Sequence, residues 1–166
     1  MVVGSNPTGP TTLERAIPLK YIALLCLAAA SLGAATVDIF SSKDLQEASN
    51  KLAAKKTPFA SENLKQWGNH LSMLAYREST GSSELHEHVA DIFVIESGQG
   101  TLLSGGKLTA SHTEKPGELR GKSIAGGEKH SFGPGDVIHI PAGIPHQVLV
   151  DKGQPVTYFV IKVTAE

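Results

Sequence analysis

Apolar residues recur at two different spacings, and the change from one to the other falls near residue 67. In residues 41–56 the spacing is that of one helix face, with apolar positions at Leu45, Ala48 and Leu52. Ser41 and Asp44 form a capping-box pattern at the start of this stretch, and a proline follows its end. We therefore predict an amphipathic helix over residues 41–56 that covers a sheet or a partner.

After residue 67, short apolar runs alternate with glycine-containing turns, which is the pattern of short β-strands. The predicted strands are Asn69–Arg77, Leu85–His88, Asp91–Glu96, Gly100–Leu103, Asp136–Ile140, Gln147–Val150 and Val156–Val163. Many short strands without interleaved helices favour a β-sandwich or barrel. The polar, glycine-rich stretch 107–129 is predicted to be a long loop.

A separate apolar segment lies near the N-terminus, where residues 21–34 (YIALLCLAAASLGA) carry no charge. Arg15 and Lys20 precede it, and Gly33 and Ala35 occupy the small-residue positions of a cleavage site. This order is typical of a secretory signal peptide, and the run is short for a membrane span, which needs about 20 apolar residues. We therefore expect cleavage after Ala35, no stable membrane span in the mature chain, and a periplasmic or secreted protein.

The composition narrows the class of protein further. Fifteen basic and 16 acidic residues give a formal net charge of −1, so the bulk charge favours neither a nucleic acid nor an anionic membrane as a partner. The single cysteine, Cys26, lies inside the apolar N-terminal segment. This excludes an internal disulfide and a multi-cysteine metal site. A length of 166 residues with 40% hydrophobic and 19% charged residues is typical of one soluble globular domain.

The candidate chemistry lies in histidines and carboxylates of the strand-rich half, since all seven histidines lie at or after His70. His86 and His88 are two residues apart, so on a strand they share one face with Cα atoms about 6.6 Å apart. Asp91 follows on the adjoining strand, and His146 comes from a proline-containing turn. Imidazole and carboxylate ligands with open positions suit a divalent transition metal such as Fe, Mn, Zn, Ni or Cu.

Two motifs in this half resemble those of the cupin superfamily. Residues 135–146 (GDVIHIPAGIPH) match the second cupin motif, G-x5-P-x-G-x2-H-x3-N, at every spacing up to His146, and Val150 replaces the closing Asn. The first motif, G-x5-H-x-H-x3–4-E-x6-G, is matched with shorter gaps and Asp for Glu by Gly81, His86, His88, Asp91 and Gly98. The resemblance covers roughly residues 67–166 and implies a jelly-roll β-barrel that forms homodimers. It also implies a metal site of three histidines and one carboxylate inside the barrel.

Two ligand sets remain open in this reading. We favour His86, His88, Asp91 and His146, because three neutral imidazoles suit the metals named above. The cupin spacing counted back from Asp91 instead pairs Glu84 with His86, so Glu84 is the alternative ligand or a group that orients a ligating imidazole. A third interpretation is a barrel that has lost its metal and keeps these residues as a hydrogen-bonded polar patch.

Three further residues are candidates for binding a small-molecule substrate. Arg120 is predicted to grip a carboxylate or phosphate at the barrel mouth, and Gln147 and Tyr158 are predicted to line the pocket. Lys162, near the C-terminus, is interpreted as a surface or edge-strand charge. His139 is interpreted as a histidine of the barrel wall.

The sequence thus predicts an all-β protein, a cupin-type jelly-roll barrel preceded by a short N-terminal helix. The expected organisation is a leader and signal peptide in residues 1–35, a helical extension in 36–66 and the barrel in 67–166. The predicted function is that of an exported protein that binds a divalent metal and acts on a small molecule, with dioxygenase-like or isomerase-like chemistry. The alternative is a non-catalytic barrel that binds a metal or a small molecule, and fold alone does not choose between them.

Overall fold

The computed structural model describes residue 1 and residues 36–164. Its contacts divide the chain into residues 1–38 and residues 39–166, and the fold lies in the second unit. The predicted signal peptide lies outside the described residues. No helix within the described part of the chain has the length and apolar character needed to cross a membrane.

Helix α1 (Ser42–Ala53) begins where the capping pattern predicts. The hydroxyl of Ser41 accepts a hydrogen bond from the backbone N–H of Asp44 at 3.2 Å, and the Asp44 carboxylate accepts one from the backbone N–H of Ser41 at 3.2 Å. This reciprocal pair satisfies two backbone donors that the first turn leaves without helical partners. The helix ends three residues before the predicted boundary, and Lys56 already has a positive φ of 52°.

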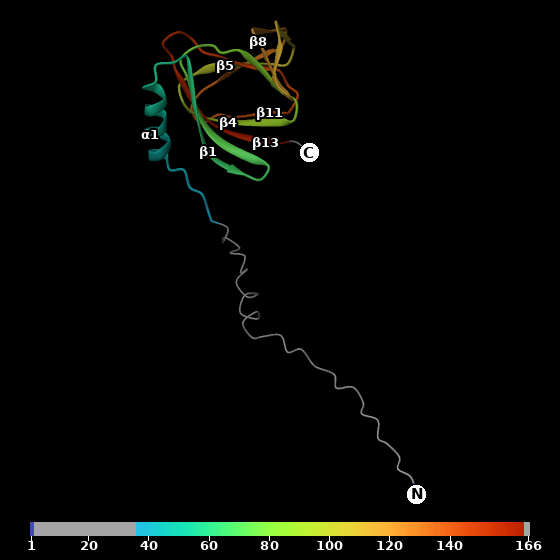
Figure 1. The fold of residues 1–166 in the computed structure, drawn as a ribbon. Helices are drawn as coiled ribbons and strands as arrows, with labels where there is room; N and C mark the ends of the chain where they lie inside the picture. The colour runs from blue at the N-terminus through green and yellow to red at the C-terminus, as the bar shows by residue number, and fades with distance from the viewer. Residues whose placement is uncertain (2–35, 165–166) are drawn as a thin grey trace. The chain divides into compact units, whose positions relative to one another are not determined.

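Most of the chain forms two antiparallel sheets (Figure 1). The first sheet has the order β1-β2-β13-β4-β11, and its strands are β1 (Phe59–Trp67), β2 (His70–Arg77), β13 (Val156–Thr164), β4 (Val89–Ser97) and β11 (Val137–Ile140). The second sheet has the order β10-β5-β12-β3-β8-β7, and its strands are β10 (Glu128–Phe132), β5 (Gly100–Ser104), β12 (His146–Leu149), β3 (Ser83–His86), β8 (Glu118–Gly121) and β7 (His112–Lys115). A separate two-stranded ribbon pairs β6 (Lys107–Thr109) with β9 (Ser123–Ala125).

The main core consists of inward-facing side chains from strands of both sheets. Its buried members are Ala75, Phe93, Ile95, Leu102, Phe132, Ile140, Val148, Val150, Val156, Tyr158 and Val160. They come from positions two apart along their strands, as expected where one face of each strand is buried. The all-β jelly-roll barrel with a short N-terminal helix is therefore confirmed.

The outer face of the first sheet is covered by helix α1. Leu52 of the helix packs with Ala60, Leu74 and Tyr76 of strands β1 and β2 in a second, smaller core. The hydroxyl of Ser49 also lies 2.9 Å from that of Thr157 on β13. The predicted amphipathic helix therefore covers a sheet of its own chain.

Two segments differ from the sequence-based expectation. Strand β1 pairs with β2 along residues 59–67, so the first sheet begins inside the segment predicted as a helical extension. β1 is an edge strand whose pattern is mostly polar, with only Ala60 buried, and it lacks the apolar alternation that reveals a half-buried strand. The predicted loop 107–129 instead contains β6–β9 and the start of β10. Each of these strands has three to five residues, many of them exposed, which weakens the sequence signal.

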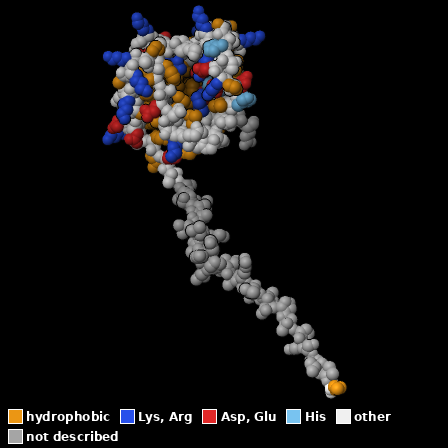
Figure 2. Space-filling view, in the orientation of Figure 1, with side chains coloured by type: hydrophobic (Ala, Val, Ile, Leu, Met, Phe, Trp, Pro, Cys, Tyr) orange, Lys and Arg blue, Asp and Glu red, His pale blue; other side chains and the backbone are white. Residues whose placement is uncertain are grey.

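Charged side chains are spread over the surface of the barrel. Figure 2 shows Lys and Arg side chains interspersed with Asp and Glu over the viewed face. This mixture agrees with the formal net charge of −1 of the whole chain.

Candidate metal centre

The second sheet carries a row of polar side chains across three neighbouring strands. Strand pairing places His146 of β12 opposite Glu84 of β3, and Glu84 in turn opposite Arg120 of β8. Two residues along β3, His86 lies opposite Glu118 of β8. Residues opposite one another on antiparallel strands have Cβ atoms about 5 Å apart, so their side chains interact directly.

The first sheet contributes a facing pair of opposite charges. Asp91 of β4 lies opposite Lys162 of β13. The Lys162 ammonium donates to both carboxylate oxygens of Asp91, at 2.7 Å to Oδ1 and 3.0 Å to Oδ2. Asp91 is only 2% exposed, so this carboxylate sits inside the barrel and its charge is neutralised locally.

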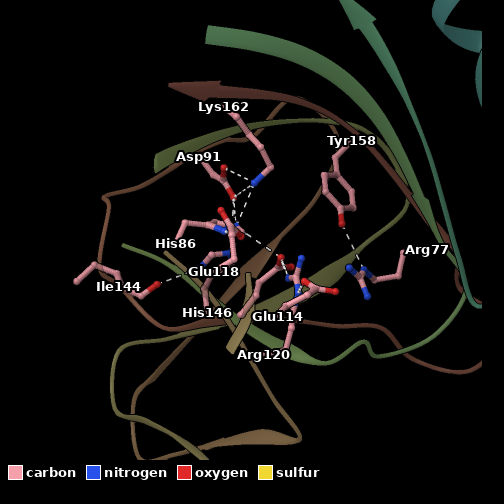
Figure 3. A network of polar contacts seen from close by, with 11 residues as sticks. Arg77, His86, Asp91, Glu114, Glu118, Arg120, Ile144, His146, Tyr158 and Lys162 are labelled. Carbon is pink, nitrogen blue, oxygen red and sulfur yellow. Dashed lines mark hydrogen bonds and ion pairs between the residues drawn. The ribbon is translucent and has the colours of Figure 1, made fainter. Parts of the chain in front are cut away.

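The polar groups of the two sheets meet in one cluster (Figure 3). One ligand atom each from Glu84, His86 and His146 lies within 4.8 Å of the others. From the opposite sheet, Asp91 Oδ2 lies 3.3 Å from His86 Nε2 and 3.6 Å from His146 Nε2. Two imidazoles and two carboxylates therefore converge on one point between the sheets.

His146 is held in a defined tautomer. Its Nδ1 donates to the backbone carbonyl of Ile144 at 3.0 Å, so Nε2 carries the lone pair of the neutral ring. Nε2 is fully buried and has no hydrogen-bond partner among the described residues. Burial lowers the pKa of His146, which keeps the ring neutral. A buried nitrogen lone pair without a partner is the state that a metal ligand requires.

His86 is fixed from both sides of its ring. The Glu118 carboxylate accepts a hydrogen bond from Nδ1, and the Lys162 ammonium lies 3.0 Å from Nε2. Burial acts to lower the pKa of His86, but the neighbouring Asp91 and Glu84 carboxylates outweigh it, so the pKa is raised. A carboxylate on the distal nitrogen is the arrangement that orients metal-binding histidines and makes them more basic.

Both carboxylates of the cluster are held in their charged form. Burial acts to raise the pKa of Glu84, but its histidine and arginine neighbours lower it below the ordinary value. Burial has the same effect on Asp91, and the adjacent His86 ring and the hydrogen bonds from Lys162 again lower the pKa. Arg120 is the direct partner of Glu84 and also donates from Nε to Glu114 at 2.7 Å. The cluster therefore offers anionic oxygens together with the neutral nitrogen of His146.

His88 does not join this cluster, and the expectation that His86 and His88 share a strand face is wrong. Strand β3 ends at His86, and the backbone N–H of Glu87 turns to the carbonyl of Gly117 at 2.8 Å. The His88 side chain is consequently 77% exposed, and its nearest carboxylate is that of Glu87 at 3.9 Å. The structure instead assembles the alternative set, in which Glu84 pairs with His86 and is joined by Asp91 and His146.

The three predicted small-molecule contacts all have partners within the protein. Arg120 is bound to Glu84 and Glu114, as described above. The Gln147 amide donates to the carbonyl of Gly81 at 2.7 Å, which ties strand β12 to the segment before β3. The buried Tyr158 hydroxyl accepts a hydrogen bond from Arg77 at 3.3 Å (Figure 3). Their roles toward a substrate stay predictions.

Sequence reasoning missed Lys162 and Glu118. β13 is a central strand, so the interpretation of Lys162 as a surface or edge charge is wrong. The two-residue period of a strand could have located it, because Lys162 lies two and four residues after the inward-facing Val160 and Tyr158 and therefore points to the same side of the sheet. Glu118 lies on β8, inside the stretch predicted as a loop, and no apolar alternation marked it.

A small cavity lies beside the cluster. A space of about 40 Å³, lined by residues that include Glu84, Asp91, Tyr158 and Lys162, lies beside it. Such a space accommodates a water molecule or an ion. A larger hollow of about 520 Å³ lies between the edge strands β10 and β11, where His139 is exposed rather than part of a closed wall. Ile144 lines this hollow, and its carbonyl is the partner of His146.

Comparison with known proteins supports the fold but not a particular activity. No family model matches the sequence, and no curated protein matches it. A solved protein from Bacillus halodurans matches with a TM-score of 0.55 and 14% identity, over 81% of this chain and 86% of that chain. A double-stranded β-helix protein from Klebsiella pneumoniae matches with a TM-score of 0.54 and 12% identity, over 79% of this chain and 93% of that chain.

An enzyme is among the solved structures that match. The DMSP lyase DddQ from Ruegeria pomeroyi has a TM-score of 0.47 and 18% identity, and the match covers 64% of this chain. The chain spans about half the length of that enzyme, with 47% covered. Taken with the antiparallel jelly roll, the match to the Klebsiella pneumoniae protein shows that this chain has the double-stranded β-helix fold, which is the fold that the cupin-like motifs imply.

Proposed function

We propose that this protein binds a divalent transition-metal ion through Glu84, His86 and His146 and uses it to bind and transform a small molecule. The observation that carries the proposal is the buried Nε2 of His146, which has no hydrogen-bond partner among the described residues and faces ligand atoms of Glu84 and His86. Leaving such a group unsatisfied costs free energy, and an ion at this point removes that cost.

The donor set indicates which ions fit. Two imidazoles and one carboxylate with open positions are typical of non-haem Fe(II) sites that react with oxygen, and Mn, Zn, Ni and Cu accept the same donors. When bound, such an ion supplies a Lewis acid or a redox centre that polarises or activates a small molecule. This supports dioxygenase-like or isomerase-like chemistry as the finer proposal.

The remaining residues of the cluster position the ligands. Glu118 and the Ile144 carbonyl each accept a hydrogen bond from the Nδ1–H of one histidine, which directs both Nε2 atoms toward the same point. Arg120 holds the Glu84 carboxylate in its charged form. These fixed partners reduce the reorganisation needed when an ion enters.

One observation favours the alternative in which the barrel has lost its metal and keeps these residues as a hydrogen-bonded polar patch. The Lys162 ammonium already contacts both Asp91 and His86 Nε2 and supplies a positive charge at the centre of the cluster. Titration of the metal-stripped protein decides between the two functions. The proposal expects stoichiometric binding of Mn²⁺ or Zn²⁺, whereas the alternative expects none.

Site-directed variants then locate the ion. His146→Ala is expected to weaken Zn²⁺ binding by at least about 100-fold, because it removes a ligand. His88→Ala is the matched control, since it makes the same change at an exposed histidine and should leave the affinity unchanged. Equal losses in the two variants, or full binding by His146→Ala, would contradict the proposal. Oxygen consumption by the Fe²⁺-loaded protein with catechols, thiols and keto acids tests the oxygenase branch.

Export and homodimer formation remain further proposals of ours. The apolar segment 21–34, with basic residues before it and small residues after it, supports cleavage after Ala35. N-terminal sequencing of the mature protein tests the cleavage site. The mass of the native protein in solution tests the dimer.

A further inference from the structure

Lys162 occupies a position that bears directly on the proposed metal centre. Its ammonium lies 2.7 and 3.0 Å from the two oxygens of Asp91 and 3.0 Å from His86 Nε2. The side chain comes from the first sheet, opposite the strands that carry Glu84, His86 and His146. Lys162 therefore contacts one proposed ligand and holds the carboxylate that faces the others.

Asp91 lies where a fourth metal ligand would lie, but its carboxylate is already bound by the Lys162 ammonium. Its Oδ2 lies within 3.6 Å of both histidine Nε2 atoms, so it faces the same point as they do. Both of its oxygens, however, accept hydrogen bonds from Lys162. An ammonium on a carboxylate neutralises the charge that would attract a dication, and it repels a dication placed beside it.

The lone pair of His86 Nε2 is contested in the same way. This nitrogen has one lone pair, which cannot serve the Lys162 ammonium and a metal ion at once. An ion can enter only if the ammonium leaves His86. Asp91 is the partner that can keep the ammonium, since it already holds it through both oxygens.

We propose that Lys162 keeps Asp91 out of the coordination sphere and thereby limits the protein ligands to Glu84, His86 and His146. This inference rests on the proposed function. It makes Lys162 a positioning residue that sets both the affinity of the site and the number of coordination positions left open for a small molecule. With three protein ligands, about three positions of an octahedral ion stay open, instead of about two with four ligands.

The direct test is Lys162→Met, which keeps most of the stem and removes the ammonium. The metal-free variant is titrated with Zn²⁺ and Mn²⁺ by calorimetry, and the Co²⁺ form is examined by its visible absorption, which reports coordination number. We expect binding at least about tenfold tighter than in the wild type, with a changed Co²⁺ spectrum. Lys129→Met, at an exposed lysine of β10, is the matched control and should change neither readout. Unchanged or weaker binding by Lys162→Met would overturn the inference.

Lys162→Met leaves the buried Asp91 carboxylate without its partner, which destabilises the fold. A second set of variants therefore tests the inference without relying on Lys162→Met alone. Asp91→Asn alone is expected to weaken Zn²⁺ binding by less than about tenfold, since Asp91 is not a ligand while Lys162 holds it. In the Lys162→Met background the same change should abolish the gain, because there Asp91 has become a ligand. A double-mutant cycle over these four proteins measures the coupling.

The outcomes separate the inference from the proposed function. If Asp91→Asn alone weakens binding as much as Glu84→Gln does, Asp91 is already a ligand, and the inference fails while the metal site stands. If neither the wild type nor any variant binds an ion, the proposed function fails and the inference fails with it. If the wild type binds no ion and Lys162→Met does, the proposed function fails for the native protein and the inference fails with it, because no bound ion is present whose ligands Lys162 limits.

Discussion

The two ends of the barrel interior differ sharply in chemistry although the same strands build both. Along β4 the inward positions run from Asp91 through Phe93 to Ile95. From His146 at the start of β12 they run through Val148 to Val150, which directly follows the strand. The polar end is defined here by Glu84, His86, Asp91, His146 and Lys162, and the apolar end by Ile95, Leu102, Phe132, Val150 and Val156.

The contrast separates stability from chemistry. Burial of the side chains at the apolar end removes apolar surface from water and so stabilises the folded state. Charged groups at the polar end lose hydration and recover only part of that loss through their partners. A cluster retained at such a cost is a candidate for function, and the two ends should respond differently to substitution.

The largest expected effect is on stability at the apolar end. Ile95 is 2% exposed, and Ile95→Ala should lower the free energy of unfolding by about 2–5 kcal/mol, through lost burial and the cavity that remains. Chemical denaturation measures this change. The affinity of the folded protein for Zn²⁺ should stay within about twofold of the wild type. A loss of affinity of tenfold or more would show that the two ends are not independent.

The next effect is on affinity at the polar end. Glu118→Ala removes the acceptor that orients His86, and we expect Zn²⁺ binding to weaken by about 10–100-fold. Glu118→Gln retains a carbonyl oxygen at this place and should recover part of the loss. Calorimetric titration of the metal-free proteins measures both variants. An alanine variant with wild-type affinity would show that Glu118 does not orient His86 for metal binding.

The smallest effect is expected where the two ends meet. The Tyr158 hydroxyl accepts a hydrogen bond from Arg77, while its ring packs against Phe93 with centroids 4.9 Å apart. Tyr158→Phe keeps the ring and should cost only about 0.5–1.5 kcal/mol of stability, with no change in Zn²⁺ affinity. Thermal denaturation and titration of the same sample test this. A clear loss of metal affinity would instead place Tyr158 within the polar end.

The apolar end was predictable from the sequence to a larger extent than the polar end. Short apolar runs in β4 and β13 mark both segments as strands, and the period of two along a strand then places every second side chain inward. The capping pattern of Ser41 and Asp44 similarly located the start of α1. These signals are local, so a single stretch of sequence contains them.

The polar end depends on contacts between distant segments. Whether Glu84 or His88 joins His86 is decided by where β3 ends, and two backbone hydrogen bonds from other parts of the chain mark that end. The Glu87 N–H donates to the carbonyl of Gly117, and the Gly143 N–H donates to that of His86. No spacing within residues 84–91 contains this information, so both ligand sets remained open at the level of the sequence.

The most direct measurement is the anomalous diffraction of crystals grown or soaked with Mn²⁺. The account predicts an anomalous peak between the sheets, within bonding distance of Glu84, His86 and His146, with Lys162 still paired to Asp91. The Nε2 of His146 should then no longer lack a partner. A map with no peak at this point, or with the peak only at exposed histidines such as His88 or His139, would contradict the central claim.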